Sequence, residues 1–263
     1  MSKKKKQPPN IDFNFEAKNK TETNECTRCG TCCEKGGPSF HHDDRMLIEK
    51  GVILSKHLYT IRRGELAYDN VQGCLRAVES DIIKIKGKGD GWICLYFDEE
   101  KRACMIYHDR PLECRALRCW DTREIERIYA SNRLTREDLV SEIEGLWELV
   151  KDHQTRCDYK KIQKMTDDLI STHSQSSYRK LLEIVRYDAE IRKLVISQGG
   201  LEEDMLDFLF GRPLTKTLRN YGFKVQQKGK KIGLVRISFC CYLGTSPYPR
   251  VCAGFASAYS YNG

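Results

Sequence analysis

The stretch around which we expect the fold to be organised runs from Cys26 to Cys33 and reads C-T-R-C-G-T-C-C. Four thiols lie within these eight residues. Soft ligands gathered in clusters are typical of a metal site, and a hydrophobic core has no need of them. A second set of thiols, much further along the chain, offers partners for the first. The sequence therefore predicts a metal centre with eight candidate ligands: Cys26, Cys29, Cys32, Cys33, Cys94, Cys104, Cys114 and Cys119.

The size and composition of the chain argue that these thiols are not disulfide staples. At 263 residues the chain is long enough for one large or two small domains without cross-links. Residues 1–10 are rich in Lys and Pro with no apolar stretch behind them, unlike a secretory signal. No apolar run reaches the length of about 18 residues that a membrane span needs. The odd number of cysteines, 13, then fits a reducing cytoplasm.

The net charge of +8 raises the question of a nucleic-acid partner. The basic residues are interspersed with 37 acidic ones, and local basic runs occur at 3–6, 84–88 and 228–231. A nucleic-acid site would need basic residues clustered on one face together with stacking aromatic side chains. The pattern favours solvated surface charge, so we do not expect nucleic acid as a partner.

The overall pattern predicts an α+β fold in which an irregular, cysteine-rich half with short hairpins packs against a mostly helical half. Composition and periodicity divide the chain into five segments: a flexible basic arm at 1–21, a cysteine-cluster metal-binding domain at 22–120, a helical region at 121–213, a hairpin at 214–239 and a low-charge tail at 240–263. The arm has too few apolar residues to offset the entropy of ordering.

Local signals place the thiols of the cysteine-rich half on turns and strand ends. Gly30 permits the unusual backbone angles of a turn that aims N–H groups at a thiolate. Asp43 or Asp44 is a candidate N-cap for a short helix that ends at Gly51. Short apolar runs at 82–85 and 92–97, joined by a Gly-rich turn, predict a hairpin, and 98–101 is the turn leading to 103–107. This arrangement would deliver Cys94 and Cys104 from neighbouring strand ends.

The segment that follows predicts a helix carrying another ligand. Pro111 suits the first turn of a helix and Asp109 is a plausible cap. Cys114 and Cys119 would project from this helix or its end. Arg110 and Arg115 would offset the charge of about −2 that four thiolates leave around a divalent ion.

Helical periodicity dominates beyond residue 120. Thr135 to Asp138 reads as a capping box before one apolar stripe of Leu139, Ile143, Leu146, Trp147 and Val150. Further helices are expected at 159–170, 178–196 and 201–210. Residues 217–237 are expected to form a hairpin whose turn lies at 228–231.

Several other residues with ligand chemistry have simpler explanations. His41 and His42 lie near the first cysteine set, but they adjoin a helix start where polar residues are ordinary. Cys74, alone in its segment, is typical of a small buried hydrophobe. Cys240, Cys241 and Cys252 belong to the low-charge tail, where a second thiol site is the alternative to a poorly ordered extension.

The spacing narrows the kind of metal without fixing it. A zinc ribbon takes two C-x2-C pairs, whereas an iron–sulfur cubane takes three cysteines from a C-x2-C-x2-C run and a fourth from elsewhere, which this chain can supply. This favours an iron–sulfur cluster over zinc. Cys32 and Cys33 are adjacent, and their diverging side chains should not both reach one ion. Cys33 could instead pack, bridge to a second site or act as a redox thiol.

The run C-T-R-C-G-T-C-C followed by C-x9-C-M-I-Y-H-D-R-P-L-E-C-R-x3-C resembles the YkgJ-type CxxCxxCC cysteine-cluster family, described as a zinc- or iron-chelating domain. The resemblance covers roughly residues 22–120. It implies metal binding by the same eight cysteines, framed by Tyr107, Arg110, Pro111 and Arg115. It implies no particular reaction, although some relatives are flagellin lysine N-methylases.

Three hypotheses for function follow. The leading one is a cytoplasmic protein whose N-terminal half folds around an iron–sulfur cluster or zinc, with redox or cluster-assisted chemistry as its use. The second is a protein-lysine N-methylase of the flagellin type, although the sequence shows no glycine-rich nucleotide loop. The third is a structural zinc module whose helical half binds a protein partner. None of them identifies catalytic residues or an oligomeric state.

Overall fold

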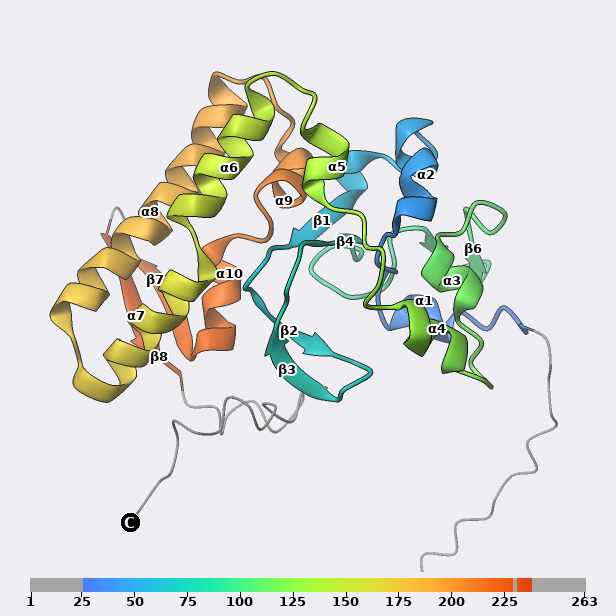
Figure 1. Ribbon diagram of the computed structural model, residues 1–263, viewed down its shortest axis with the longest axis horizontal. Helices are drawn as coiled ribbons and strands as arrows, with labels where there is room; N and C mark the ends of the chain where they lie inside the picture. The colour runs from blue at the N-terminus through green and yellow to red at the C-terminus, as the bar shows by residue number, and fades with distance from the viewer. Residues whose placement is uncertain (1–25, 229–230, 238–263) are drawn as a thin grey trace, which may run out of the picture.

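The computed structural model describes residues 26–228 and 231–237. The expected arm at 1–21 and the tail at 240–263, with its three cysteines, lie outside the described residues. Within them the α+β prediction is confirmed. Short antiparallel hairpins make up much of the N-terminal half, and long helices dominate the C-terminal half (Figure 1). No helix in this part of the chain is long and apolar enough to cross a membrane.

The strands of the described part form four separate two-stranded antiparallel sheets. Each sheet is small, so neighbouring helices and loops must cover its faces. The pairs are β1 (Leu58–Ile61) with β4 (Ile82–Ile85), β2 (Leu66–Asp69) with β3 (Cys74–Ala77), β5 (Phe97–Asp98) with β6 (Ala103–Cys104), and β7 (Phe223–Lys228) with β8 (Lys231–Arg236). The expected C-terminal hairpin is confirmed from residue 223 onward, but residues 214–221, which the sequence assigns to the hairpin segment, are helical. Strands β5 and β6 confirm the turn at 98–101.

The hairpin predicted between 82–85 and 92–97 is wrong. Strand β4 pairs instead with β1, in a register that places Leu58 opposite Ile85 and Ile61 opposite Ile82. All four of these side chains are buried, so this pairing hides two apolar strands at once. Residues 93–95 contact the extension of β4 through a bridge between Gly87 and Cys94. Two backbone hydrogen bonds add to this contact, from the Lys88 N–H to the Ile93 carbonyl and from the Leu95 N–H to the Lys86 carbonyl. The Cys94 N–H is left to bond the first cysteine set.

The cysteine-rich half contains short helices that lie to the right in Figure 1. The helix expected near 43–51 is confirmed, and Asp44 is its N-cap residue as predicted, although the Asp44 side chain makes no cap hydrogen bond to it. Asp44 instead forms a capping box with His41, which is the N-cap of the short 3-10 helix just before. The elements are α1 (Thr31–Glu34), η1 (His42–Asp44), α2 (Arg45–Glu49), η2 (Ser55–His57), α3 (Leu112–Ala116) and α4 (Arg123–Ile128).

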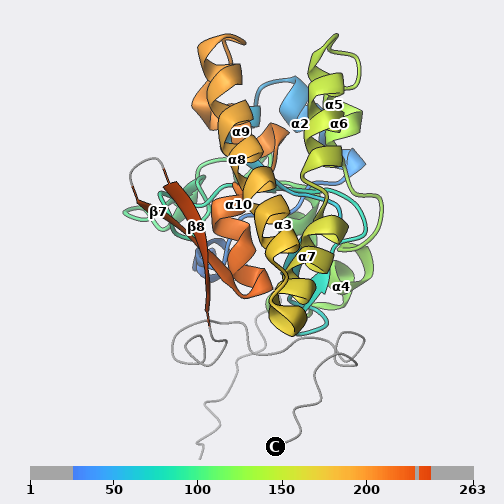
Figure 2. The ribbon, with the colours of Figure 1, turned by 90° about the vertical axis from the view of Figure 1, so that its left-hand side faces the viewer.

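The helical half confirms the expected helices with one correction. The single stripe predicted from Leu139 to Val150 is divided at Gly145, whose φ of 74° lies in the left-handed region, and Ile143 is exposed in the break. The elements are α5 (Arg136–Val140), α6 (Leu146–Arg156), α7 (Tyr159–Thr172), α8 (Gln175–Ser197), η3 (Glu203–Met205), α9 (Leu206–Leu209), α10 (Leu214–Thr217) and η4 (Leu218–Tyr221). Helices α7 and α8 pack side by side, and β7–β8 lies beside α8 and α10 (Figure 2).

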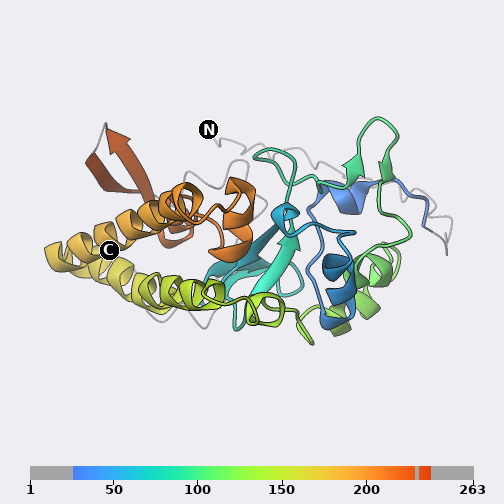
Figure 3. The same ribbon diagram turned by 90° about the horizontal axis from the view of Figure 1, so that it is seen from above.

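Two clusters of buried side chains hold these elements together. The first runs from Phe40 and Cys94 through the β1–β4 sheet to Phe208 and Phe210, so it joins the two halves. Seen from above, β1 and β4 lie between the cysteine-rich part and the long helices (Figure 3). The second cluster lies between α7, α8 and the C-terminal elements and includes Tyr159 and Tyr221. The surroundings of Cys94 are therefore part of the main core.

Helix α3, which carries Cys114, is fastened to the segment 39–44. The predicted cap Asp109 is wrong, because the N-cap is Pro111 and its side chain caps nothing. The carboxylate of Asp44 accepts a hydrogen bond from the Leu112 N–H at 2.7 Å and another from the His41 N–H at 3.0 Å. Asp44 is fully buried, so its loss would leave two backbone donors without a partner.

We predict that Asp44→Ala lowers the free energy of unfolding by about 2 to 3 kcal/mol, because two buried N–H groups lose their acceptor. Asp43→Ala is the matched control, since Asp43 is exposed and should change stability by no more than about 0.5 kcal/mol. Urea unfolding of both variants measures the difference. Equal effects at the two positions would contradict the role assigned to Asp44.

Candidate metal centre

The first cysteine set is shaped by the turn at Gly30 that precedes α1. Gly30 has a φ of 82° and is the N-cap of α1, which carries Cys32 and Cys33. A Cβ added at Gly30 would lie 2.3 Å from Cζ of Phe97. The predicted need for glycine therefore has two causes, the left-handed backbone and the close approach of the Phe97 ring. Both fix the turn against the strand that follows Cys94.

The second cysteine set reaches the first through backbone contacts. The Cys94 N–H donates to the Cys33 carbonyl at 2.8 Å, and the Phe97 N–H donates to the Cys94 carbonyl at 2.9 Å. Cys104 lies opposite Phe97 in the β5–β6 pair. The expected delivery of Cys94 and Cys104 from neighbouring chain segments is thus observed, although only Cys104 lies in a strand.

Cys114 lies on α3, and the residue before it, Glu113, holds this helix in place. One carboxylate oxygen of Glu113 accepts from the Ser39 N–H at 2.6 Å, and the other lies 3.4 Å from Nε2 of His41. The pKa of Glu113 is lowered, because the hydrogen bond from His41 and the charge of Lys84 outweigh the effect of burial. Glu113 and Asp44 together fix the position of Cys114.

Five thiols affect one another's pKa: Cys32, Cys33, Cys94, Cys104 and Cys114. Charge on Cys32 acts on Cys29 as well. The pKa of Cys114 is raised by burial and further by charge on Cys94, Cys32 and Cys104. The pKa of Cys94 is raised by burial and by charge on Cys104 and Cys32. Without a cation most of these thiols keep their protons, whereas a bound metal ion would favour the thiolates.

The adjacent thiols of Cys32 and Cys33 affect each other's protonation. Interaction with Cys33 is the largest cause of the low pKa of Cys32, about 6. The same interaction, burial and nearby charge raise the pKa of Cys33. One proton shared in this way stays on Cys33, so Cys32 is the better ligand of the pair.

The other three predicted ligands lie at the surface. Cys26, Cys29 and Cys119 are exposed, and Cys119 comes after the end of α3. The sulfur of Cys29 lies 3.3 Å from the Thr31 hydroxyl, and this hydrogen bond lowers the pKa of Cys29. Cys32 is exposed as well, so exposure alone does not separate these three cysteines from the other five.

Positive side chains surround this group of thiols. Arg110 and Arg28 stack on the ring of Tyr107, at 3.7 Å and 4.2 Å from its centroid. The charge of Arg110 favours the thiolate form at Cys32 and Cys104. Arg102 donates to the Cys29 carbonyl at 2.6 Å and pairs with Glu34. The framing role expected of Tyr107 and Arg110 thus has a physical basis in charge compensation.

The spacing of the sulfurs is wider than in a closed single-ion site. Among the described residues, no three of the eight cysteine sulfurs lie within 4.8 Å of one another. Four thiolates around one zinc ion, with bonds of about 2.3 Å, would place their sulfurs about 3.8 Å apart. The donor set suits a soft metal, but it is arranged more openly than a zinc tetrahedron.

Residues 25–133 match the model of the CxxCxxCC family, whose description reads "Putative zinc- or iron-chelating domain". This segment is similar to the CxxCxxCC family. No significant similarity is found to a curated protein or to a solved structure. The CxxCxxCC match runs past residue 120, and the backbone explains this, because the Leu134 N–H donates to the Phe40 carbonyl and His42 N–H to the Asn132 carbonyl.

The histidines beside the CxxCxxCC motif have structural roles. His41 is buried, and its Nδ1 lies 2.8 Å from the Ser131 carbonyl while Nε2 faces Glu113. Both ring nitrogens are therefore engaged by the protein. His42 is exposed and lies 3.8 Å from Asp138. Cys74 is buried in β3, but it is disulfide-bonded, so the expectation of a simple small hydrophobe is wrong.

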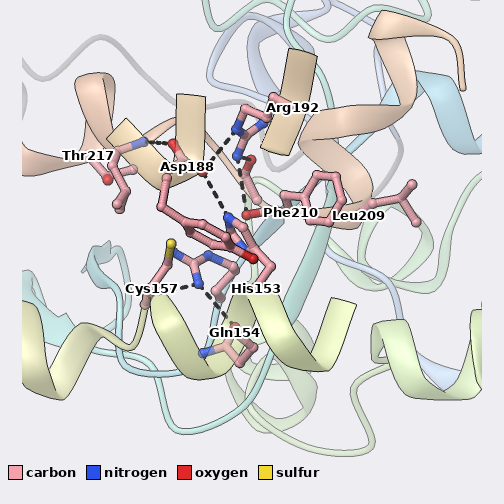
Figure 4. A network of polar contacts seen from close by, with 12 residues as sticks. His153, Gln154, Cys157, Asp188, Arg192, Leu209, Phe210 and Thr217 are labelled. Carbon is pink, nitrogen blue, oxygen red and sulfur yellow. Dashed lines mark hydrogen bonds and ion pairs between the residues drawn. The ribbon is translucent and has the colours of Figure 1, made fainter. Parts of the chain in front are cut away.

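The sequence reasoning missed a second constellation in the helical half. His153 and Cys157 at the end of α6 meet Asp188 of α8, and one ligand-type atom from each lies within 4.8 Å of the others (Figure 4). The signal that could have found it is the i, i+4 spacing of His153 and Cys157 on one helix face. All three residues are buried. A thiol, an imidazole and a carboxylate in this order can form a nucleophilic triad, but this one has no access to substrate.

We predict that Gly30→Ala lowers the free energy of unfolding by about 3 kcal/mol, through left-handed strain and the clash with Phe97. Gly51→Ala is the matched control, because Gly51 has a φ of 71° but nothing within 4 Å of an added Cβ. It should cost only the backbone strain of about 1 kcal/mol. Thermal or urea unfolding compares the two, and a Gly30 variant no worse than the Gly51 variant would refute the contact.

We also predict opposite pH dependences at two buried histidines. Burial lowers the pKa of His153 to about 4, against an ordinary value of 6.5, so the unfolded chain binds the proton first as the pH falls. As the pH falls from 6.5 to 4, the free energy of unfolding of the wild type should decrease by about 3 kcal/mol relative to that of His153→Gln.

At His41 burial opposes protonation, but the hydrogen bond to Glu113 raises the pKa overall. The contribution of His41 is therefore complete below pH 6.5 and is lost as the pH rises through the raised value. Urea unfolding of His41→Gln and wild type across this range should show the reverse trend to His153→Gln. The same slope for both variants would contradict these assignments.

Proposed function

We propose that residues 25–133 bind a soft metal centre, and that this centre is an iron–sulfur cluster in preference to a zinc ion. We further propose that the helical half stabilises this centre by packing against it. Four cysteines would hold it: Cys32, Cys94, Cys104 and Cys114. The assignment goes beyond the zinc- or iron-chelating description of the CxxCxxCC family. It rests on which thiols share one region of the molecule.

The wide spacing of the sulfurs is the observation that carries the preference for iron and sulfide. A cubane presents a separate iron atom to each cysteine, so its ligating sulfurs lie further apart than those around one zinc ion. No three cysteine sulfurs of the described part lie within 4.8 Å of one another. A single zinc ion would require the sulfurs to close in further than a cluster would, and this supports iron and sulfide over zinc.

The residues around the proposed ligands would control charge and access. Arg110 lies where it favours thiolates at Cys32 and Cys104. Lys84, whose amine donates to the Ser39 hydroxyl at 3.3 Å, favours the thiolate at Cys94. A bound cluster would supply one-electron chemistry, and these cations would stabilise its anionic state. Cys33 would keep a proton and donate it to Cys32 in a hydrogen bond, which is a recognised way to tune such a centre.

A structural zinc module is the second candidate, and the burial of Cys94 favours it. Cys94 is 6% exposed and belongs to the cluster that joins the two halves of the molecule. Cys33 and Ile93 pack against this cluster as well. A metal bound here would be part of the core, so its removal would loosen the whole fold.

We predict that Cys94→Ser and Cys114→Ser lose the bound metal, while Cys26→Ser and Cys119→Ser retain it. The latter two thiols are exposed and are not among the four proposed ligands. Each variant is purified anaerobically as the full chain, and its iron, zinc and acid-labile sulfide are measured together with its visible absorption spectrum. Circular dichroism is the control for folding.

The same measurements separate the candidate functions. Iron and sulfide in equal amounts, with visible absorption that bleaches on reduction, support the cluster. A colourless protein that holds zinc and no sulfide rules out the cluster and supports the structural module. Loss of metal from the Cys26 and Cys119 variants, with retention in the Cys94 and Cys114 variants, would overturn the ligand assignment itself.

A further inference from the structure

The triad of His153, Cys157 and Asp188 is a second place where this chain gathers metal-ligand chemistry, and the CxxCxxCC match at 25–133 does not include it. His153 and Cys157 lie one turn apart at the end of α6, and Asp188 projects from α8 toward them (Figure 4). Cys157 and His153 are fully buried and Asp188 is 2% exposed. The three ligand-type atoms lie within 4.8 Å of one another.

One ring nitrogen of the triad's histidine is buried without a hydrogen-bond partner, and a ligand could engage it. Nε2 of His153 lies 2.8 Å from a carboxylate oxygen of Asp188, but Nδ1 is buried and has no hydrogen-bond partner. The Cys157 side chain also ends in this apolar interior as a thiol, because burial raises its pKa to about 12. A buried polar atom without a partner is costly, and a bound ion is one arrangement that removes this cost.

The residues around the triad orient its side chains by hydrogen bonds, as the residues next to the ligands of a metal site do. Asp188 accepts from Nε of Arg192 at 3.0 Å and from the Leu214 N–H at 2.9 Å. These bonds fix the carboxylate, and the carboxylate in turn fixes the imidazole ring. A carboxylate that orients a ligating histidine is a recurring feature of metal sites.

Charge and coordination decide which ion suits the triad. Arg192 lies against Asp188, and Nη1 of Arg62 donates to the Cys157 carbonyl at 3.0 Å, so two guanidinium groups face one carboxylate. A monovalent ion that replaces the thiol proton leaves the net charge unchanged, whereas a divalent ion adds a positive charge beside two others. The triad also offers fewer ligands than the four that a structural zinc site uses. Soft thiolate ligands suit Cu(I) as well as zinc, and here the charge and the small number of ligands favour Cu(I).

We propose that His153, Cys157 and Asp188 form a buried binding site for a soft monovalent metal ion of the Cu(I) class, separate from the cysteine centre. Binding breaks the S–H bond of Cys157, forms a sulfur–metal bond and releases one proton to solvent. A ring nitrogen of His153 is the second ligand, and Asp188 ligates or orients that ring. No electron is transferred in this step, so it needs no oxidant or reductant.

The burial of the site determines how the ion enters. None of the three residues reaches the surface, so α6 and α8 must separate locally before the ion can bind. Binding to the folded state alone then stabilises the helical half. The ion should consequently bind slowly, and it should leave slowly once it is bound.

The test uses the full chain, purified anaerobically with its own metal centre and labelled with ¹⁵N in histidine. Cu(I) is supplied from a bathocuproine-buffered solution, with Ag(I) as a second probe that cannot be oxidised under the same conditions. The ¹⁵N resonances of the imidazoles report the site directly. His153→Gln assigns its own signals, and His173→Gln, at the end of α7, is the matched control. Bound copper is counted in wild type and in Cys157→Ser.

The expected result is a large shift of one ring nitrogen of His153 on addition of Cu(I), absent in Cys157→Ser, with the loss of one copper equivalent from that variant and none from His173→Gln. Unchanged His153 resonances in folded wild type at saturating Cu(I) would overturn the proposal. So would equal copper content in wild type and Cys157→Ser, or a His153 shift produced by Zn²⁺ and not by Cu(I). The ¹⁵N measurement on wild type keeps the test decisive even where a variant fails to fold.

Discussion

The hydrogen bond from the Cys94 N–H to the Cys33 carbonyl, 2.8 Å long, is the contact on which the cysteine-rich half depends. It joins the end of α1 to the loop that leaves the β1–β4 sheet, and so unites two thiol sets that are far apart in the sequence. Phe97 then packs against Gly30, which locks the turn before α1. The remaining ligand helix, α3, is fastened by Asp44 and Glu113 to the segment 39–44. The metal centre is thus built from backbone contacts first and side chains second.

Two different electrostatic settings follow from this arrangement. In the segment that matches the CxxCxxCC family, charge on neighbouring thiols raises the pKa of Cys33, Cys94 and Cys114, so a cation is required to bring several thiolates together. In the helical half, Asp188 is shared between His153 and Arg192, and burial keeps the imidazole neutral. The first group has an excess of potential negative charge. The second already holds its cations, which is why the two sites would favour different ions.

The hydrophobic core connects the cysteine cluster with the triad of His153, Cys157 and Asp188. Cys94 belongs to the same buried cluster as Val150 of α6 and Phe210, and Phe210 contacts the ring of His153 at a centroid distance of 4.8 Å. The ion pair between Arg136 and Asp81, at 2.6 Å, ties α5 to the β4 end of the sheet. A change of packing at either site can therefore reach the other through rigid, close-packed side chains.

The sequence by itself determined the α+β class, the long helices, the C-terminal hairpin and the concentration of soft ligands, because periodicity and residue chemistry are local properties. It also required glycine at position 30. It could not determine that β4 pairs with β1, since both candidate partners of β4 are apolar and only the core decides between them. Nor could it show that the cap of α3 is Asp44 and not Asp109, or that His153 and Cys157 meet Asp188. These contacts join residues distant in the chain, and only the tertiary structure brings them together.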